Sequence, residues 1–289
     1  MILAQLTDTH IRSGRQVAYG RVDTCSMLEN AVAHINNFRP NVEAVIVTGD
    51  ITDRGELEAF HVFREIINEL VPPWYVVPGN HDSRENFLEA FKDCYYLKNS
   101  SDFIHYSVDD HPVRLIGFDT TVENKPYGFL TEERLLWLDN CLAEKTQKTT
   151  ILFQHHPPFC TGINHMDVQN LINGKELIQL LTSHRQVRHV ACGHVHRASE
   201  ACIDGVGISI APNAAHSTTL DLDPSGPSSF SMDPPAIRIF RVDAEGYLTS
   251  HLSYLGNFDG PHPYFKPDGK LVCELIIFIE HLALNFLEQ

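Results

Sequence analysis

Seven side chains able to bind a metal ion stand where apolar runs of this 289-residue sequence end. Five runs end in this way, and the residues concerned are Asp8 with His10, Asp50, Asn80, His155, and His194 with His196. A single aspartate after a strand is ordinarily a turn former or a helix cap. The repetition of the pattern at five places favours instead a site for divalent transition-metal ions, which bind mixed oxygen and nitrogen donors.

Asp50 is the residue around which we expect this site to form. It follows an apolar run, residues 44–48, of the kind that forms a strand buried on both faces of a parallel sheet. Ligands of such sheets bind beyond the carboxyl ends of the strands. Gly49 allows a sharp turn at the end of this strand, so we expect the Asp50 carboxylate to face the binding edge.

The spacing of two residue pairs predicts further convergence. Side chains at i and i+2 on an extended backbone point to the same side, so Asp8 with His10, and His194 with His196, each present two ligands to one place. Seven donors are too many for one tetrahedral ion and suit two ions that share a carboxylate. Asp50, alone at the end of a central strand, is the expected bridging ligand.

A pair of divalent ions at this edge would favour a small anion. Asp8 and Asp50 offset about two of about four positive charges, so the pocket stays positive inside an acidic protein. Ions roughly 3.5–4 Å apart can clamp a phosphoryl group and hold a bridging hydroxide in line with the phosphorus. Metal binding brings the pKa of a water down to about 7, so no side-chain nucleophile is required. The expected chemistry is phosphoester hydrolysis.

Alternating strands and helices would hold these residues at one edge. Strand, helix, strand, helix, strand over the first 77 residues predicts a parallel sheet with right-handed crossovers. The first helix has Asp23 or Thr24 as its cap and ends before Pro40. Other helices are expected from Leu57, after Thr131 and near Lys175. The strands expected along the chain are 2–6, 44–48, 74–77, 103–108, 113–118, 149–153, 189–192, one near Ile208, 236–242 and 247–254.

Composition limits the classes of function and the compartment. The chain has 37 acidic and 22 basic residues, a formal charge of -15, so extended nucleic-acid binding is not expected. Its seven cysteines are scattered and are expected to be reduced. We see no signal-peptide pattern and no window, Leu271–Leu287 included, that supports a membrane span, which favours a cytoplasmic protein.

Five motifs in order carry a resemblance to a known family. They are Asp8-x-His10, Gly49-Asp50, Gly79-Asn80-His81-Asp82, His155-x-Pro157 and Gly193-His194-x-His196. Over about the first 215 residues they resemble the motif set of the calcineurin-like metallophosphoesterases. Further segments are similar to the class III cyclic nucleotide and glycerophosphodiester phosphodiesterases, namely Tyr19-Gly20, His155-His156-Pro157-Pro158, Met166-Asp167, Asn173-Gly174 and His216.

This resemblance implies a fold and a division of roles. The fold is α/β, a four-layer sandwich of two mixed β-sheets flanked by helices. One metal would be held by Asp8, His10, Asp50 and His196, and the other by Asp50, Asn80, His155 and His194. His81 and His216 would hydrogen-bond the phosphate oxygens or help to protonate the leaving group. Two divalent or mixed-valence ions per chain, from Mn, Fe, Co and Zn, suit this mixture of donors.

Several residues keep two interpretations. Either His155 or His156 can be the metal ligand in its motif, and the His-x-Pro spacing favours His155. Tyr19 either lines the pocket or has a purely structural packing role. His165 lies outside the motifs and is expected to be an ordinary surface or core residue. We expect a catalytic domain at 1–255 and a C-terminal extension at 256–289, which caps the site or joins copies of the chain in a homo-oligomer, a dimer or an assembly of dimers.

The leading hypothesis is a dinuclear metal-dependent phosphodiesterase that hydrolyses small phosphodiesters, such as cyclic nucleotides or glycerophosphodiesters, with a metal-bridging hydroxide as nucleophile. A phosphomonoesterase, or an enzyme acting on both esters, is the alternative within the same chemistry. A non-catalytic binding or scaffolding protein on the same fold is a third hypothesis. Relatives of that kind usually lack metal ligands, whereas all seven are present here.

Overall fold

The computed structural model describes residues 1–98 and 103–272 of the chain. Residues Met1–Leu255 form one compact unit and Gly256–Gln289 a second. Within the described part of the second unit, an isolated bridge pairs Phe265 with Leu271. The cap or oligomer contact expected of the tail at 271–289 lies, apart from its first two residues, outside the described residues.

The first sheet contains the strand that precedes Asp50. Its order is β13-β12-β1-β2-β3, with β1, β2 and β3 parallel and with β12 and β13 antiparallel. The strands are β1 (Ile2–Leu6), β2 (Ala44–Thr48), β3 (Trp74–Val77), β12 (Ala236–Val242) and β13 (Leu248–Tyr254). Helices α1 (Thr24–Asn37) and α2 (Leu57–Ile67) join the parallel strands, which confirms the predicted alternation.

The second sheet is also mixed. Its order is β4-β5-β6-β7-β9-β8, in which β5, β6, β7 and β9 are parallel and both edge strands are antiparallel. The strands are β4 (Tyr106–Val108), β5 (Arg114–Phe118), β6 (Thr150–Gln154), β7 (Val187–Cys192), β8 (Ser199–Ile203) and β9 (Val206–Ile210). Helices α4 (Glu132–Glu144) and α6 (Gly174–Thr182) follow β5 and β6.

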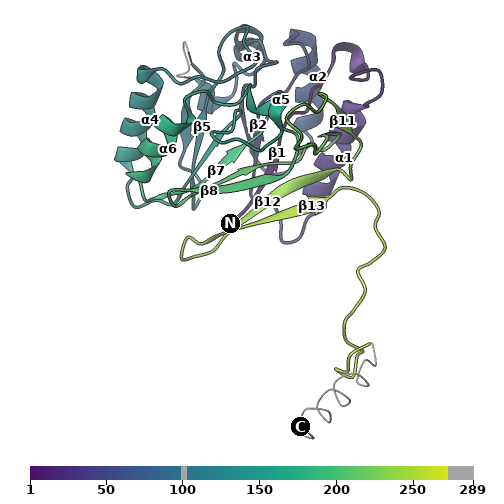
Figure 1. Ribbon diagram of the computed structural model, residues 1–289. Helices are drawn as coiled ribbons and strands as arrows, with labels where there is room; N and C mark the ends of the chain where they lie inside the picture. The colour runs from purple at the N-terminus through teal and green to yellow at the C-terminus, as the bar shows by residue number, and fades with distance from the viewer. Residues whose placement is uncertain (99–102, 273–289) are drawn as a thin grey trace, which may run out of the picture. The chain divides into compact units, whose positions relative to one another are not determined.

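Alternate side chains along the strands of the second sheet pack into two different hydrophobic cores. Leu115 and Ile151 pack between the sheets, whereas Ile116 and Leu152 face the helix side. Figure 1 shows α4 and α6 on one outer face and α1 and α2 on the other, with both sheets between them. The expected sandwich of two mixed sheets flanked by helices is therefore confirmed. Each large apolar side chain that is fully buried in this way contributes about 1.5–3 kcal/mol.

Helix caps and short elements complete the unit. Asp23, not Thr24, caps α1, because its side chain accepts a hydrogen bond from the Ser26 N–H; Thr131 caps α4 through the Arg134 N–H.

The sequence prediction missed α3, α5, β8 and the small ribbon of β10 and β11. The short elements are α3 (Arg84–Ala90), α5 (Asn164–Asp167), β10 (Ser217–Thr218), β11 (Phe230–Ser231) and the 3-10 turns Ser13–Arg15 and Tyr95–Leu97. Among the described residues, none of the helices has the length and apolar character needed to cross a bilayer.

Buried polar side chains tie the two sheets together. Gln5 in β1 donates from Nε2 to the Cys192 carbonyl in β7 (2.9 Å), and Arg238 in β12 donates to the Ile210 carbonyl in β9 (3.1 Å). His189 in β7 also lies between the sheets, with its ring 5.1 Å from that of Phe240. These contacts fix how the strand ends of one sheet lie opposite those of the other.

Burial of His189 predicts a pH dependence of stability. Burial lowers the pKa of this imidazole from 6.5 to about 4, so between these pH values the unfolded chain takes up a proton that the folded chain does not. Stability is therefore lost as the pH falls from about 6.5 towards 4, and at pH 5 the loss from this group is about 2 kcal/mol. We expect the free energy of unfolding of His189→Gln, measured by urea denaturation at pH 7 and pH 5, to lack this pH-dependent contribution. His251→Gln, at an exposed position of β13, should keep the wild-type dependence, and an unchanged dependence in His189→Gln would refute the assignment.

Candidate metal centre

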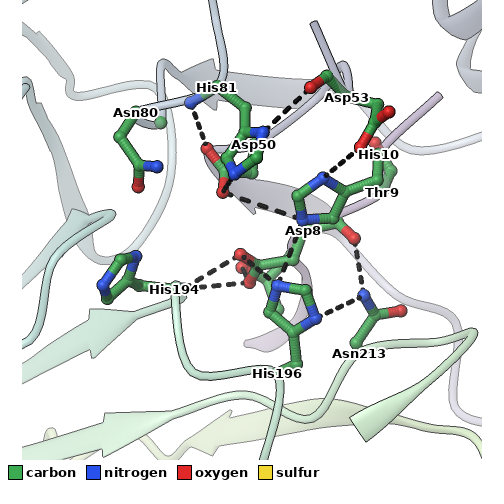
Figure 2. Close-up of polar contacts among 12 residues, drawn as sticks. Asp8, Thr9, His10, Asp50, Asp53, Asn80, His81, His194, His196 and Asn213 are labelled. Atoms are coloured by element: carbon green, nitrogen blue, oxygen red, sulfur yellow. Dashed lines mark hydrogen bonds and ion pairs between the residues drawn. The ribbon is translucent and has the colours of Figure 1, made fainter. Parts of the chain in front are cut away.

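The seven predicted ligands come together where the carboxyl ends of both sheets meet. Loops after β1, β2 and β3 carry four of them, and loops after β6 and β7 carry the rest. All are buried except Asn80 and His196, which are partly exposed. Figure 2 shows Asp8, His10, Asp50, Asn80, His194 and His196 directed towards a common space.

Asp50 lies between histidines that belong to different sheets. Its Oδ2 atom is 3.4 Å from His155 Nε2 and 3.7 Å from His10 Nε2. The backbone N–H of His81 donates to its other oxygen at 2.9 Å. One carboxylate oxygen thus faces ligands on both sides, which is the geometry that a bridging ligand requires.

The remaining donors form a group on each side of Asp50. On the first side His10 Nε2 lies 3.1 Å from His196 Nε2, which is 3.3 Å from Asp8 Oδ1. On the second side His155 Nε2 lies 3.1 Å from Asn80 Oδ1 and 3.3 Å from His194 Nδ1. The donors therefore lie on two sides of Asp50, which faces His10 on one side and His155 on the other.

These distances fit metal ions. Protein donors bind zinc-like ions at about 2.0–2.2 Å, so donors that share an ion lie about 3–3.5 Å apart. The separations of 3.1–3.4 Å between His10 and His196, Asp8 and His196, and Asp50 and His155 lie in this range. The donor set fits a divalent metal centre.

The backbone at the ligands is not extended, contrary to the assumption on which the i and i+2 pairing was predicted. Asp8, His10, Asp50, His194 and His196 all have positive φ values, between 43° and 73°, so none of them is extended. The side chains converge because the loops turn in a left-handed conformation, which costs an L-residue roughly 1–2 kcal/mol. Strain of this kind is typical of functional sites.

Two glycines make this packing possible. Gly49 has a φ of 86° and turns the chain just before Asp50, as predicted. A Cβ atom on Gly193 would collide with Thr7, with the Thr48 carbonyl and with Asp8. The β7 loop can therefore approach the β1 loop only with glycine at this position.

Burial and neighbouring charges shift the pKa values of the donors in different directions. Burial acts to raise the pKa of Asp50, but the imidazoles of His155 and His81 hold it well below the ordinary value. Burial lowers the pKa of His10 and His194, which keeps these rings neutral. Burial also acts to lower the pKa of His155, yet Asp50 raises it to about 9. His155 must therefore lose a proton before it can bind a cation.

Three neighbouring residues to which the sequence analysis gave no role support the ligands. Asp53 Oδ1 lies 3.6 Å from His10 Nδ1, the ring nitrogen that faces away from His196. Asp82 accepts hydrogen bonds from the N–H groups of Ile51, Thr52 and Gly79, which links the Asp50 and Asn80 loops, and Asn213 donates to the Asp8 carbonyl (2.6 Å). Asp53 and Asp82 stand only two or three positions from a predicted ligand, and that proximity was the available signal.

His156 is held by protein groups on both sides of its ring. Nε2 lies 3.2 Å from the Pro126 carbonyl and must donate to it, so Nδ1 accepts from the Thr120 hydroxyl at 2.8 Å. Burial lowers the pKa of this imidazole to about 3. Both nitrogens are engaged, whereas His155 directs Nε2 into the site and faces the Thr48 carbonyl with Nδ1. This arrangement favours His155 as the ligand.

A cavity of about 370 Å³ opens onto the donors. His81 and His216 both line it, and His216 Nε2 faces His196 Nδ1 at 3.1 Å. Tyr19 lines it as well, against the ring of Phe230 (5.5 Å). His165, at the start of α5, also forms part of the wall.

Comparisons with known proteins agree with this geometry. Residues 1–198 match the model of the family described as calcineurin-like phosphoesterase. A "probable glycerophosphodiester phosphodiesterase GpdQ" of Arcobacter nitrofigilis is 42% identical over 94% of this chain and all of that protein. The "glycerophosphodiester phosphodiesterase GpdQ" of Enterobacter lignolyticus is 30% identical over 91% of this chain and 95% of its own. The "3',5'-cyclic adenosine monophosphate phosphodiesterase CpdA" of Escherichia coli K12 is 27% identical over 92% of each chain.

Solved structures support the fold. A dimetal phosphatase from Danio rerio superposes with a TM-score of 0.60 at 15% identity, over 88% of this chain and 98% of that one. The purple acid phosphatase PPD1 of yellow lupin gives a TM-score of 0.62 at 12% identity, over 83% of this chain and 49% of its own. At these identities the likeness concerns the fold alone.

The position of Asp53 predicts an indirect effect on metal binding. A carboxylate beside the outer nitrogen of a ligating histidine orients the ring, and its loss lowers metal affinity by about 10- to 100-fold. We expect Asp53→Asn to show a loss of this size for Mn²⁺ or Zn²⁺ in competition with a chromophoric chelator. Asp139→Asn, at a 54% exposed carboxylate on α4, should bind like the wild type. Equal affinities in both variants would contradict the role given to Asp53.

Proposed function

The chain belongs to the calcineurin-like phosphoesterase family, and from this premise we propose that it is a metal-dependent hydrolase of small phosphodiesters. The observation that carries the proposal is the Asp50 carboxylate, one oxygen of which faces His10 on one side and His155 on the other. The names of the relatives, which refer to glycerophosphodiesters and to cyclic AMP, support a diester as the substrate. A cavity of about 370 Å³ has room for a small one.

We assign two ions to this centre. The first is held by Asp8, His10, Asp50 and His196, and the second by Asp50, Asn80, His155 and His194, in agreement with the two groups of facing donors. Mn, Fe, Co and Zn all suit these donors. When bound, two such ions supply an activated water as nucleophile and neutralise charge on the phosphoryl group.

His81 is proposed to act on the phosphate directly. Its Nδ1 lies 2.8 Å from the Asp53 carbonyl and must donate to it, so Nε2 faces the donors, 4.0 Å from Asp50 Oδ2. The negative charge of Asp50 raises the pKa of His81, an effect that bound cations would oppose. When Nε2 carries a proton, it can donate to a phosphate oxygen or give that proton to the leaving alkoxide. His216, which lines the same cavity with its Nε2 at 3.1 Å from His196 Nδ1, is proposed to assist.

The proposal predicts activity that depends on both metal and Asp50. Metal-replete protein should hydrolyse bis(4-nitrophenyl) phosphate and should lose this activity on chelation. Asp50→Ala should lower the rate by about a hundredfold or more, because the shared ligand that positions the charge is gone. Asp139→Asn serves as the matched control and should keep the wild-type rate.

The same assay separates the alternatives. Cleavage of 4-nitrophenyl phosphate but not of the diester would favour a phosphomonoesterase, and comparable rates would favour an enzyme that acts on both. Metal-replete protein that is inert on a broad panel of phosphoesters would favour a non-catalytic protein. Full activity in Asp50→Ala would refute the proposal.

A further inference from the structure

A chain of buried hydrogen-bonding side chains leads from the contact between the two sheets to the metal ligand Asp8. Gln5 Nε2 lies 2.9 Å from the Oγ1 atom of Thr48, the last residue of β2. Thr48 Oγ1 lies 2.7 Å from Thr7 Oγ1, which in turn lies 2.5 Å from Asp8 Oδ2. All four residues are at most 2% exposed. The relay, as we call Gln5, Thr48 and Thr7, is therefore shielded from bulk water.

The Cys192 carbonyl sets the direction of the hydrogen bonds in the relay. A carbonyl oxygen only accepts, so the nitrogen of the Gln5 amide faces it at 2.9 Å and donates. The second N–H of this nitrogen goes to the Thr48 hydroxyl, which leaves the single Thr48 proton for Thr7. Thr7 then donates to the Asp8 carboxylate, which only accepts when it is ionised. Both ends of the relay thus require the same direction, with each donor pointing towards Asp8.

The other acceptors near the two hydroxyls are more distant. Thr48 Oγ1 lies 3.4 Å from the Leu6 carbonyl, and Thr7 Oγ1 lies 3.3 Å from the Thr48 carbonyl. The relay contacts of 2.7 Å and 2.5 Å are shorter and are therefore the stronger hydrogen bonds. Aligned hydrogen bonds that end on a charge also reinforce one another where water is excluded.

The relay makes the two oxygens of Asp8 unequal. Oδ2 accepts from the Thr7 hydroxyl and, at 3.0 Å, from the His194 N–H. Oδ1 shares that N–H, at 3.1 Å, and lies 3.3 Å from His196 Nε2 on the first side of the metal centre (Figure 2). Thr7 therefore holds Oδ2 against the protein and leaves Oδ1 directed at the place of the first ion.

We propose that the relay residues are positioning residues, which fix the Asp8 carboxylate for the first metal ion. The inference rests on the proposed function, in which Asp8 is a ligand of that ion alone. Thr7 acts on the carboxylate directly, Thr48 acts only through Thr7, and Gln5 acts through Thr48. Because the relay begins at the Cys192 carbonyl in β7, it also links the packing of the two sheets to the geometry of this ligand.

The test measures the affinity of each ion separately, by titration of the metal-free protein with Mn²⁺ against a chromophoric chelator. His10→Ala removes a ligand of the first ion and so identifies the binding step of that ion. Thr7→Val removes the hydroxyl at nearly constant volume, and we expect the first ion to bind about 10- to 100-fold more weakly while the second is unchanged. Thr48→Val should weaken the same ion to a lesser extent, because its carbonyl, which faces His155 Nδ1, stays in place.

The double variant Thr7→Val/Thr48→Val distinguishes a relay from two separate structural effects. If Thr48 acts only through Thr7, the double variant should bind the first ion as weakly as Thr7→Val alone. Two independent losses would instead multiply, and that result would overturn the relay. Thr7→Ser keeps the hydroxyl and should bind both ions like the wild type, which separates loss of the hydrogen bond from a fold defect.

Thr150→Val is the matched control. Thr150 is buried at the start of β6, and its hydroxyl donates to the Lys148 carbonyl (2.8 Å), at the end of the strand opposite to the His155 loop. Both ions should bind to this variant as they bind to the wild type.

Three further results would overturn the relay: unchanged affinity for the first ion in Thr7→Val, equal losses for both ions, or a loss in Thr7→Ser as large as that in Thr7→Val. The proposed function fails by itself where wild-type protein binds both ions but leaves bis(4-nitrophenyl) phosphate intact. Wild-type protein that binds no Mn²⁺ would overturn both.

Discussion

The site depends on one carboxylate oxygen that faces imidazoles from two separate sheets. Asp50 lies at the end of β2, His10 comes from the β1 loop of the same sheet, and His155 comes from the β6 loop of the other. Distances of 3.4 Å and 3.7 Å on its two sides exist only while the carboxyl ends of both sheets remain opposite each other. The packing of the sandwich is therefore a condition for the chemistry, and the contacts of Gln5 and Arg238 between the sheets help to maintain it.

The ligand loops are strained, and the rest of the fold offsets that strain. Five ligands adopt left-handed backbone conformations, each of which costs roughly 1–2 kcal/mol. Buried neutral histidines beside ionised aspartates add a cost that a bound cation relieves, since metal binding requires those forms of the side chains. Burial acts to lower the pKa of His155, but the Asp50 carboxylate raises it to about 9, so this imidazole must lose a proton when a cation binds.

The sequence predicts the convergence of the ligands but not the means by which it is achieved. Apolar runs such as residues 44–48 mark buried strands, and parallel strands of one sheet end at the same edge, which brings Asp50 towards Asp8 and Asn80. His155 belongs to the other sheet, so its approach to Asp50 was implied only by the family resemblance. The left-handed turns at Asp8 and His10 could not be foreseen, because a spacing of two residues is compatible with several backbone conformations. The place of His165 in the cavity wall could not be foreseen, since only tertiary packing carries α5 there. The exposed strand β8 lacks the apolar pattern that revealed its neighbours.

The central claim, that Asp50 joins two metal ions, is tested most directly by anomalous diffraction from crystals of the metal-loaded protein. The account predicts two peaks per chain, roughly 3.5–4 Å apart, with the Asp50 carboxylate between them. One peak lies beside His10 and His196, and the other beside His155 and His194. A single peak, or two peaks of which only one touches Asp50, would contradict it.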